Sequence, residues 1–348
     1  MAAELRRAPH LRTPVSVPVL MRRVLYALVP ALLAYTWFFG FGLVFNIAAA
    51  VAAALATEAA CLRLQRRPIA IALSDYSAVV TGVLLAFALP PLTPWWITAL
   101  GSTFAIGVAK HAYGGVGNNV FNPAMAGYVA LLVSFPDQLT NWLPPRMGDI
   151  DYEGIGLLAN LRFMLSGGLP DGYTLDALTR ATPLDLMQTE LGDMRMVAEI
   201  RNSSLFGDFG GRGWEWIGNF VALGGFWLLF RGVIRWHIPV GMLGGLVLSA
   251  SLFYLYDSAN FPSPGFHLFS GGALLCAFFI ATDPVSAATT DRGRLIYGAG
   301  IGVLTYLIRT WGSFPDGVAF AVLLMNMTVP LIDRYTQPVA YGTREPRS

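Results

Sequence analysis

Long apolar stretches joined by polar connections dominate the chain. Ten of them approach the roughly 20 residues that a helix needs to cross a bilayer. They cover about residues 24–40, 41–62, 76–92, 95–110, 121–135, 214–230, 238–256, 266–282, 295–310 and 316–332. Several are short for a membrane span, which predicts tilted or broken helices. The pattern predicts an all-α polytopic membrane protein with about ten transmembrane helices.

The ten stretches fall into two groups of five on either side of one long polar segment. An odd number of spans in each half would place the halves in opposite orientations, as in inverted-repeat transport folds. The predicted parts are an N-terminal segment, a first half of five helices, a loop, a second half of five helices and a C-terminal tail, at residues 1–23, 24–135, 136–213, 214–333 and 334–348.

Composition agrees with this fold class. Hydrophobic residues make up 55% of the chain and charged residues 13%, against about a quarter charged in soluble proteins, and the mean hydropathy is +0.55. These values exclude an ordinary soluble enzyme. The two cysteines, Cys61 and Cys276, lie in separate apolar stretches, so the sequence supports neither a disulfide framework nor a cysteine-ligated iron–sulfur cluster.

The distribution of basic residues predicts the orientation. Most of the 23 lysines and arginines fall in connections that would be cytoplasmic if both termini are cytoplasmic. The segment 136–213 then lies on the outer face, and apolar spacing predicts two helices in it, near 155–165 and 184–199. Tryptophans near the span ends are predicted as interfacial belts: Trp95, Trp96, Trp142, Trp214, Trp216 and Trp236.

The start of the second loop helix has two compatible interpretations. Thr182 followed by Pro183 and Asp185 has the pattern of a helix N-terminus, with a capping hydroxyl, a proline in the first turn and an acid near the positive end of the dipole. A phosphodiester on the Thr182 hydroxyl would also face the amide groups of that helix end.

The second interpretation comes from the residues that lead to Thr182. Asp176, Thr179, Ala181 and Thr182 have the spacing Asp-x-x-Thr-x-Ala-Thr, which resembles the acceptor motif of flavin transferases. Those enzymes couple FMN through its phosphate to the last threonine hydroxyl. Arg180 adds a cation that could make a charge-assisted contact with the phosphate.

A glycine- and asparagine-rich segment precedes the fifth apolar stretch. Residues 114–127 read GGVGNNVFNPAMAG, and the amides of Asn119 and Asn122 are three residues apart. Asn122 ahead of Pro123 could simply cap a helix. The alternative is that both amides, which need partners inside a membrane, bind a ligand with donors and acceptors at its edge.

Acidic residues within or beside the apolar stretches are further candidates, because burying them in a membrane is costly. Asp75, Asp257 and Asp283 fall at the ends of stretches, where a cap near water is the simpler interpretation. Glu58 is the deepest; it lies about one turn from Arg63, and its carboxylate could extend toward the inner surface.

Three segments together identify a family. Residues 114–127, residues 176–182 and the run ATDPVSA at 281–287, in a ten-span plan, resemble the RnfD family of the Rnf electron-transport complexes. That family is related to the NqrB component of the sodium-translocating NADH:quinone reductases. The resemblance covers essentially the whole chain. Arg180 departs from the quinone-reductase branch, which usually has glycine there.

The resemblance implies two flavin cofactors. FMN would be joined covalently to Thr182 on the outer face, and riboflavin would bind non-covalently toward the inner side. By this resemblance, the FMN motif comprises Asp176, Thr179, Arg180, Ala181 and Thr182, the riboflavin contacts are Asn119 and Asn122, and Asp283 helps to bind flavin or an ion. No metal-ligand spacing and no dinucleotide fingerprint is found, so NADH should bind elsewhere.

The resemblance also implies the function, a membrane flavoprotein that carries electrons within a Na⁺- or H⁺-translocating NAD(H):ferredoxin or flavodoxin oxidoreductase and is not catalytic alone. The expected partners are a second covalent FMN subunit, two iron–sulfur membrane subunits, cytoplasmic NADH- and ferredoxin-handling subunits, a flavin transferase and membrane lipid, without nucleic acid. The expected location is the bacterial inner membrane, with both termini cytoplasmic and the loop periplasmic.

Two other functions are compatible with the residues alone. A flavin-free transporter or channel of inverted-repeat type is suggested by the five-plus-five plan and by Asn122-Pro123-Ala124. An assembly scaffold would use the loop helices only to dock partners, and electron transfer would then not need Thr182.

Overall fold

The computed structural model describes residues 16–115, 117–146, 156–168, 174, 178–314 and 316–337, and within these residues it is helical without a β-strand. The first group of helices runs to residue 140. It comprises α1 (Val17–Phe39), α2 (Gly42–Leu64), α3 (Ile69–Leu73), α4 (Ser77–Ala88), α5 (Trp95–Phe104), the π-helical segment η1 (Ala105–His111), α6 (Pro123–Ser134) and α7 (Pro136–Thr140).

The helices after residue 156 fall into two sets. Among the described residues of the predicted loop, three short helices occur: α8 (Leu157–Ser166), α10 (Pro183–Gly192) and α11 (Val197–Ile200). The second large group comprises α12 (Trp214–Phe230), α13 (His237–Tyr256), α14 (Pro264–Phe269), α15 (Ala273–Leu275), the π-helical η2 (Cys276–Ile280), α16 (Asp291–Trp311) and α17 (Val318–Thr336).

Each of the ten predicted apolar stretches coincides with one helix or with two or three consecutive helical segments. Within the described ranges, four helices, α1, α2, α13 and α17, are both long and apolar enough to cross a membrane, and the chain is a membrane protein. Others are shorter, such as α4 and α6 with 12 residues each. The count of ten spans stays a prediction.

The predicted loop helix at 184–199 was wrong in its continuity. The chain forms α10 and α11 with a turn between them, in which Met194 has a left-handed φ of +62°. The Val197 amide then donates to the Ala259 carbonyl, 2.9 Å away. That bond attaches α11 to the connection between α13 and α14, so the chain must change direction after α10.

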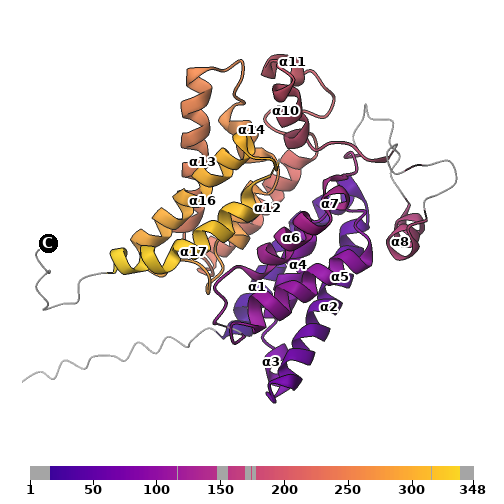
Figure 1. The fold of residues 1–348 in the computed structure, drawn as a ribbon, viewed down its shortest axis with the longest axis vertical. Helices are drawn as coiled ribbons and strands as arrows, with labels where there is room; N and C mark the ends of the chain where they lie inside the picture. Colours follow the sequence, from indigo (N-terminus) through magenta and orange to yellow (C-terminus); the bar gives the residue numbers. More distant parts are fainter. Residues whose placement is uncertain are drawn as a thin grey trace, which may run out of the picture.

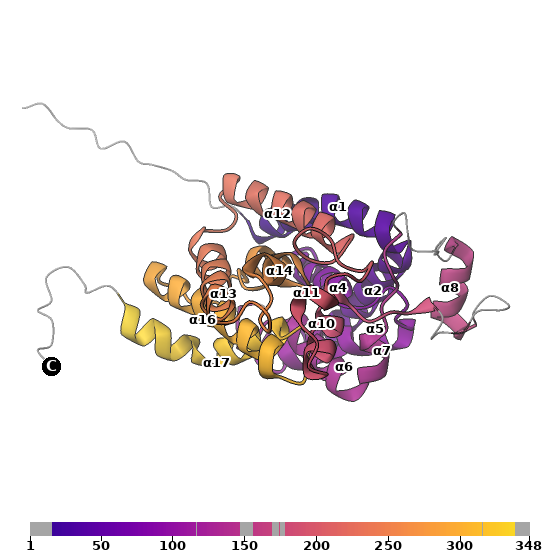
Figure 2. The ribbon, with the colours of Figure 1, turned by 90° about the horizontal axis from the view of Figure 1, so that it is seen from above.

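The two large groups of helices lie beside each other, as the separate indigo-to-magenta and orange-to-yellow regions of Figure 1 show. In the first group α2 packs on α4 and α5, and α5 packs on α6. In the second group α13 packs on α14 and α16, and α16 packs on α17. The groups meet where α1 packs on α12, side by side in Figure 2, and where α6 packs on α17.

Small residues allow α13 and α16 to approach backbone to backbone. A Cβ at Gly298 would lie 2.6 Å from the Ile238 carbonyl oxygen, and a Cβ at Gly245 would lie 2.6 Å from that of Ala299. In lipid, helix association depends on such close packing rather than on a hydrophobic driving force. This pair is therefore the rigid centre of the second group.

The apolar stretch predicted at residues 266–282 forms a broken helix. Helix α14 ends at Phe269, the chain turns through residues 270–272, and α15 with η2 continues to Ile280. The sequence predicted broken helices from short apolar stretches, and this break confirms one of them. Its turn requires glycine, because Gly271 has φ +63° and a Cβ there would lie 2.5 Å from Leu184 Cδ1. The break therefore packs against α10 at Leu184.

Candidate functional site

Thr182 begins helix α10 as its N-cap. Its Oγ1 accepts a hydrogen bond from the Asp185 amide at 3.1 Å, and Pro183 occupies the first turn. This confirms the capping interpretation. Before it, the Arg180 amide donates to the Trp142 carbonyl at 2.8 Å. That bond fixes the approach of the chain, so Thr182 stands at a defined position between α7 and α12.

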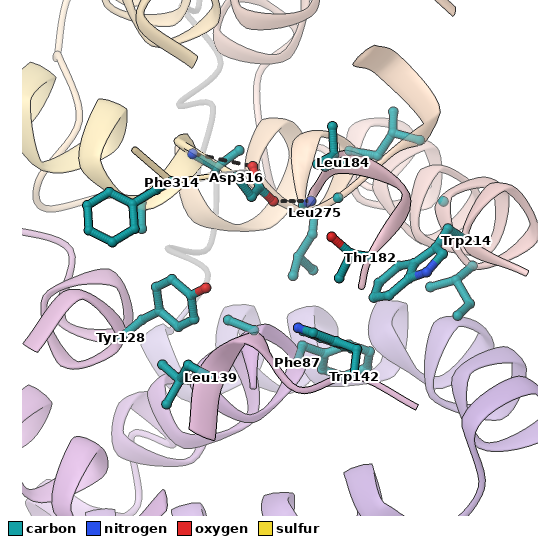
Figure 3. Close-up of a pocket in the computed structure, with 18 of the residues that line it drawn as sticks. Phe87, Tyr128, Leu139, Trp142, Thr182, Leu184, Trp214, Leu275, Phe314 and Asp316 are labelled. Atoms are coloured by element: carbon teal, nitrogen blue, oxygen red, sulfur yellow. Dashed lines mark hydrogen bonds between the residues drawn. The ribbon is translucent and has the colours of Figure 1, made fainter. Parts of the chain in front are cut away.

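An aromatic pocket opens beside Thr182. It is lined by α4, α6, α12, the α14–α15 break and the start of α17, so both large helix groups contribute to it. Its aromatic lining residues are Tyr35, Phe87, Tyr128, Trp142, Trp214 and Phe314. Figure 3 shows the Thr182 side chain between Trp214 and Asp316, with Trp142 and Phe87 along the opposite wall.

The tryptophans of this pocket pack together. The rings of Trp142 and Trp214 are edge to face with centroids 4.9 Å apart, and Phe39 lies 4.9 Å from Trp214. The sequence predicted both tryptophans as interfacial belts. That position in the membrane stays a prediction. The structure shows that both line a pocket wall, where residues 142 and 214 become adjacent because the two helix groups meet.

Helix α10 is held over the pocket from both sides. The Gln188 amide nitrogen donates to the Gly312 carbonyl at the end of α16, 2.7 Å away. On its other face Leu184 and Met187 are buried in a cluster with Val197 and Phe266. Thr182 is therefore presented to the pocket by a helix with its own small core.

An ion pair closes the helix break behind the pocket wall. The Arg309 guanidinium donates to the carbonyls of His267 and Ser270, at 2.6 and 3.1 Å, and to Asp316 Oδ1 at 3.0 Å. Asp316 Oδ2 accepts from the Gly272 amide at 2.7 Å. The cation thus meets the carbonyl end of α14 and the anion meets the amide end of α15, as the helix dipole favours.

Two carboxylates, Asp185 and Asp316, are the only charged side chains among the described residues that line the pocket. The Asp185 side chain lies in the first turn of α10, where partial burial raises the pKa of its carboxyl. The sequence interpretation used Asp185 only as a helix-start residue and did not use Asp316. Asp316 could have been suspected from Arg309, which lies inside the apolar stretch 295–310, because a cation in such a stretch needs an anionic partner.

Of the predicted asparagines, Asn122 meets Asp283 at one carbonyl, that of Ile280. Asn122 is buried; its Nδ2 donates to the Ile280 carbonyl at 3.0 Å and its Oδ1 accepts from the Met125 amide at 3.1 Å. The Asp283 amide donates to the same Ile280 carbonyl at 3.2 Å, and Asp283 Oδ2 accepts from the Ser286 amide and hydroxyl. Asn122 thus caps α6, and Asp283 holds a turn.

Asn326 completes this network and was not predicted. Its Oδ1 accepts from the Asn122 amide at 3.0 Å, and its Nδ2 donates to the Ser286 carbonyl and to Tyr297 Oη. It is 1% exposed. An asparagine in the middle of an apolar stretch was the available signal. Asn119 stands apart from this network, and its Nδ2 donates to the Phe121 carbonyl at 3.1 Å.

The remaining motif residues are less enclosed. Arg180 is exposed, Thr179 is half-buried, and Ala181 lines a small second cavity that also touches Thr182 and Trp142. Asp176, the first residue of the motif, lies outside the described residues.

Glu58 forms a second buried ion pair, far from the pocket residues in sequence. Its carboxylate lies 2.6 Å from Lys110 Nζ and 3.5 Å from His111 Nε2, and Lys110 also donates to Ser77 Oγ at 2.8 Å. The expected extension of Glu58 toward the surface near Arg63 was wrong. The side chain turns into the bundle because Lys110, in π-helical η1, offers it a cation there.

Comparison with known proteins gives consistent relatives. The model of the NQR2, RnfD, RnfE family matches residues 4–342. The chain is 48% identical over 352 residues to the D subunit of the ion-translocating oxidoreductase complex of Aliivibrio salmonicida, with 99% of this chain and 100% of that protein covered.

Two further relatives have the same name. The protein of Vibrio cholerae serotype O1, strain ATCC 39541, is 50% identical over 349 residues, with 98% and 100% covered. That of Aeromonas salmonicida is 51% identical over 347 residues, with 97% and 98% covered. These similarities extend over nearly all of each chain.

Proposed function

The chain belongs to the NQR2, RnfD, RnfE family, and from this premise we propose that it carries electrons on flavin as part of an ion-translocating oxidoreductase complex. The complex would exchange electrons between NAD(H) and ferredoxin or flavodoxin and couple this to Na⁺ or H⁺ movement. The observation that carries the proposal is the position of Thr182 at the edge of an aromatic pocket formed by both helix groups.

The residues around Thr182 fit a covalent FMN. Its hydroxyl stands at the start of a 10-residue helix, where amide groups and the dipole favour a phosphate. The pocket beside it offers the faces and edges of Phe87, Trp142 and Trp214 to a flat ring system. Asp176, Thr179, Arg180 and Ala181 would form the segment recognised by the flavin transferase.

In this proposal the bound flavin supplies the redox chemistry, and the chain supplies position and environment. Thr182 tethers the flavin, which would otherwise dissociate from a pocket that is open to solvent. The aromatic wall excludes water from one side of it. Gln188 holds α10 to α16, so the tether stays in place while electrons pass.

The proposed riboflavin site involves Asn119 and Asn122. The Asn122 amide is engaged by Ile280 and Met125, so in this proposal it shapes the site. Asn119, whose side-chain amide donates to the Phe121 carbonyl within its own turn, makes the direct contact. The Asp283 amide donates to the Ile280 carbonyl that Asn122 also contacts, so Asp283 would help to fix the position of that carbonyl beside the site.

We also propose ten spans in two inverted halves. The support is the equivalent packing of the two groups: α2 on α4 and α5 in the first, α13 on α14 and α16 in the second, with α6 and α17 following in each. In the bacterial inner membrane both termini would be cytoplasmic and α10 periplasmic. The proposed partners are a second covalent FMN subunit, two iron–sulfur membrane subunits and the cytoplasmic NADH- and ferredoxin-handling subunits.

The test is covalent flavin on the denatured chain. The full chain is expressed with a flavin transferase and viewed under ultraviolet light on a denaturing gel, beside Thr182→Val and a control, Thr189→Val, on the exposed face of α10. We expect fluorescence in the wild type and in Thr189→Val, and none in Thr182→Val. A dark wild-type band, with a transferase shown to be active on another substrate, would overturn the proposal and favour a flavin-free transporter.

A further inference from the structure

The charged residues that line the aromatic pocket all carry negative charge. Asp185 and Asp316 reach it, and none of the described lining residues is Arg, Lys or His. Within this pocket a flavin beside Thr182 would therefore meet two carboxylates and no cation, whereas Arg180 and Arg212 line the small neighbouring cavity that also touches Thr182. Carboxylates on an aromatic, poorly hydrated wall interact more strongly with a nearby charge than they would in water.

The cation that pairs with Asp316 is hidden behind the pocket wall. The side chain of Arg309 is 1% exposed, whereas that of its partner Asp316 is 28% exposed. The guanidinium is already engaged by the carbonyls of His267 and Ser270. The ion pair therefore presents its negative member to the pocket, and its positive member holds the helix break together.

Asp185 is the simpler of the two carboxylates. Its backbone amide donates a hydrogen bond to Thr182 Oγ1. Within the described part of the chain, its carboxylate has neither a hydrogen-bond donor nor a cation as partner. It lies only three residues after the tether. Because no cation among the described residues compensates it, a second negative charge placed in the same pocket would be repelled by its carboxylate.

From this arrangement we infer that the negative charges of Asp185 and Asp316 lower the redox potential of the flavin on Thr182. The inference rests on the proposed function. Electron transfer onto the flavin adds negative charge to the pocket, and no bond to this chain forms or breaks. The electron comes from another redox carrier of the complex. Both carboxylates oppose the added charge, so the flavin becomes a stronger reductant, and Arg309 limits the effect.

The experiment measures potential and attachment separately. The full chain, expressed with flavin transferase and purified in detergent, is titrated potentiometrically at fixed pH and low salt while flavin absorbance is followed. Attachment is read from fluorescence on a denaturing gel. The variants are Asp185→Asn, Asp316→Asn, the double variant and Asp316→Glu, which keeps the charge. The control is Asp193→Asn, which removes an acid at the far end of α10, outside the pocket.

We expect Asp185→Asn and Asp316→Asn each to shift the midpoint potential in the positive direction and the double variant to shift it further. Asp316→Glu and Asp193→Asn should stay close to the wild type. Attached flavin with an unchanged or more negative potential in both single variants would overturn this inference alone. Absence of attached flavin in the wild type would overturn the proposed function and this inference together. Should Asp316→Asn fail to fold, Asp185→Asn decides the result.

Discussion

In the part of the chain that the structure describes, each large helix group contains one buried lysine or arginine near the end of a helical segment, and the two cations have different roles. Lys110 in η1 pairs with Glu58, and the two side chains are 4% and 1% exposed. Arg309 in α16 pairs with Asp316, whose side chain is 28% exposed and lines the aromatic pocket. The first pair is closed within its helix group, whereas the second joins a helix break to a pocket.

The difference shows how location decides what an ion pair does. Two fully buried charges lose their hydration completely, so each depends on the other and on Ser77 for its stability. Arg309 instead has backbone carbonyls as additional partners, and Asp316 keeps partial contact with the pocket. The second pair can influence a ligand because its carboxylate lines the aromatic pocket, whereas the Glu58 side chain is 1% exposed and buried within its helix group.

The largest expected effect is on the closed pair. Lys110→Met leaves the Glu58 carboxylate buried without its cation, so we expect a loss of about 3–5 kcal/mol of stability. The double variant Glu58→Gln/Lys110→Met should recover most of it, because no charge then remains buried. Thermal unfolding in detergent measures both.

The exposed pair Arg235–Asp291 provides the control for this result. Its side chains are 64% and 56% exposed, so Arg235→Met should lower the unfolding temperature far less than Lys110→Met does. Equal losses in Lys110→Met and Arg235→Met would contradict the closed character of the first pair.

A smaller loss is expected for the second pair. Arg309→Gln removes the charged donor from two carbonyls, yet the amide can still donate to one of them and water can reach Asp316. We expect a loss of about 2 kcal/mol, measured by the same unfolding assay. A loss as large as that of Lys110→Met would show that the two pairs are equally closed.

The turn in the helix break gives the third prediction. In Gly271→Ala the new Cβ meets Leu184 and Asp316 in a left-handed conformation, so we expect a loss of about 1–3 kcal/mol and a looser α10. Gly232→Ala is the matched control, because Gly232 has φ +64° with nothing within 4 Å, and it should lose about 1 kcal/mol. Equal losses would mean that Leu184 does not pack tightly against the break.

The smallest effect concerns pH. Burial raises the pKa of Asp185 above its ordinary value of 3.8, so the native state binds this proton more tightly than the unfolded state. The penalty is absent below the ordinary pKa and is complete above the raised one. Asp185→Asn should therefore unfold at a slightly higher temperature than the wild type near neutral pH, and the gain should disappear toward pH 4. A gain that grows on acidification would contradict the raised pKa.

Much of the local structure followed from periodicity and helix-start signals. The apolar stretches located the long helices, and Thr182 with Pro183 predicted the start of α10, which the structure confirms. These features depend on neighbours within a few residues, so a single sequence contains the required information. The break in the predicted helix 184–199 was missed, because it is imposed by a bond from Val197 to Ala259, far along the chain.

Hydropathy, spacing and capping act locally, and they are enough to specify an apolar, helical membrane protein with a capped helix at Thr182. What faces Thr182 depends on packing between distant segments. Trp142, Trp214 and Asp316 are far apart in sequence, and they form one pocket only because the two helix groups pack together. The partner of Glu58 has the same origin, since a buried charge pairs with whichever opposite charge the packing places within reach.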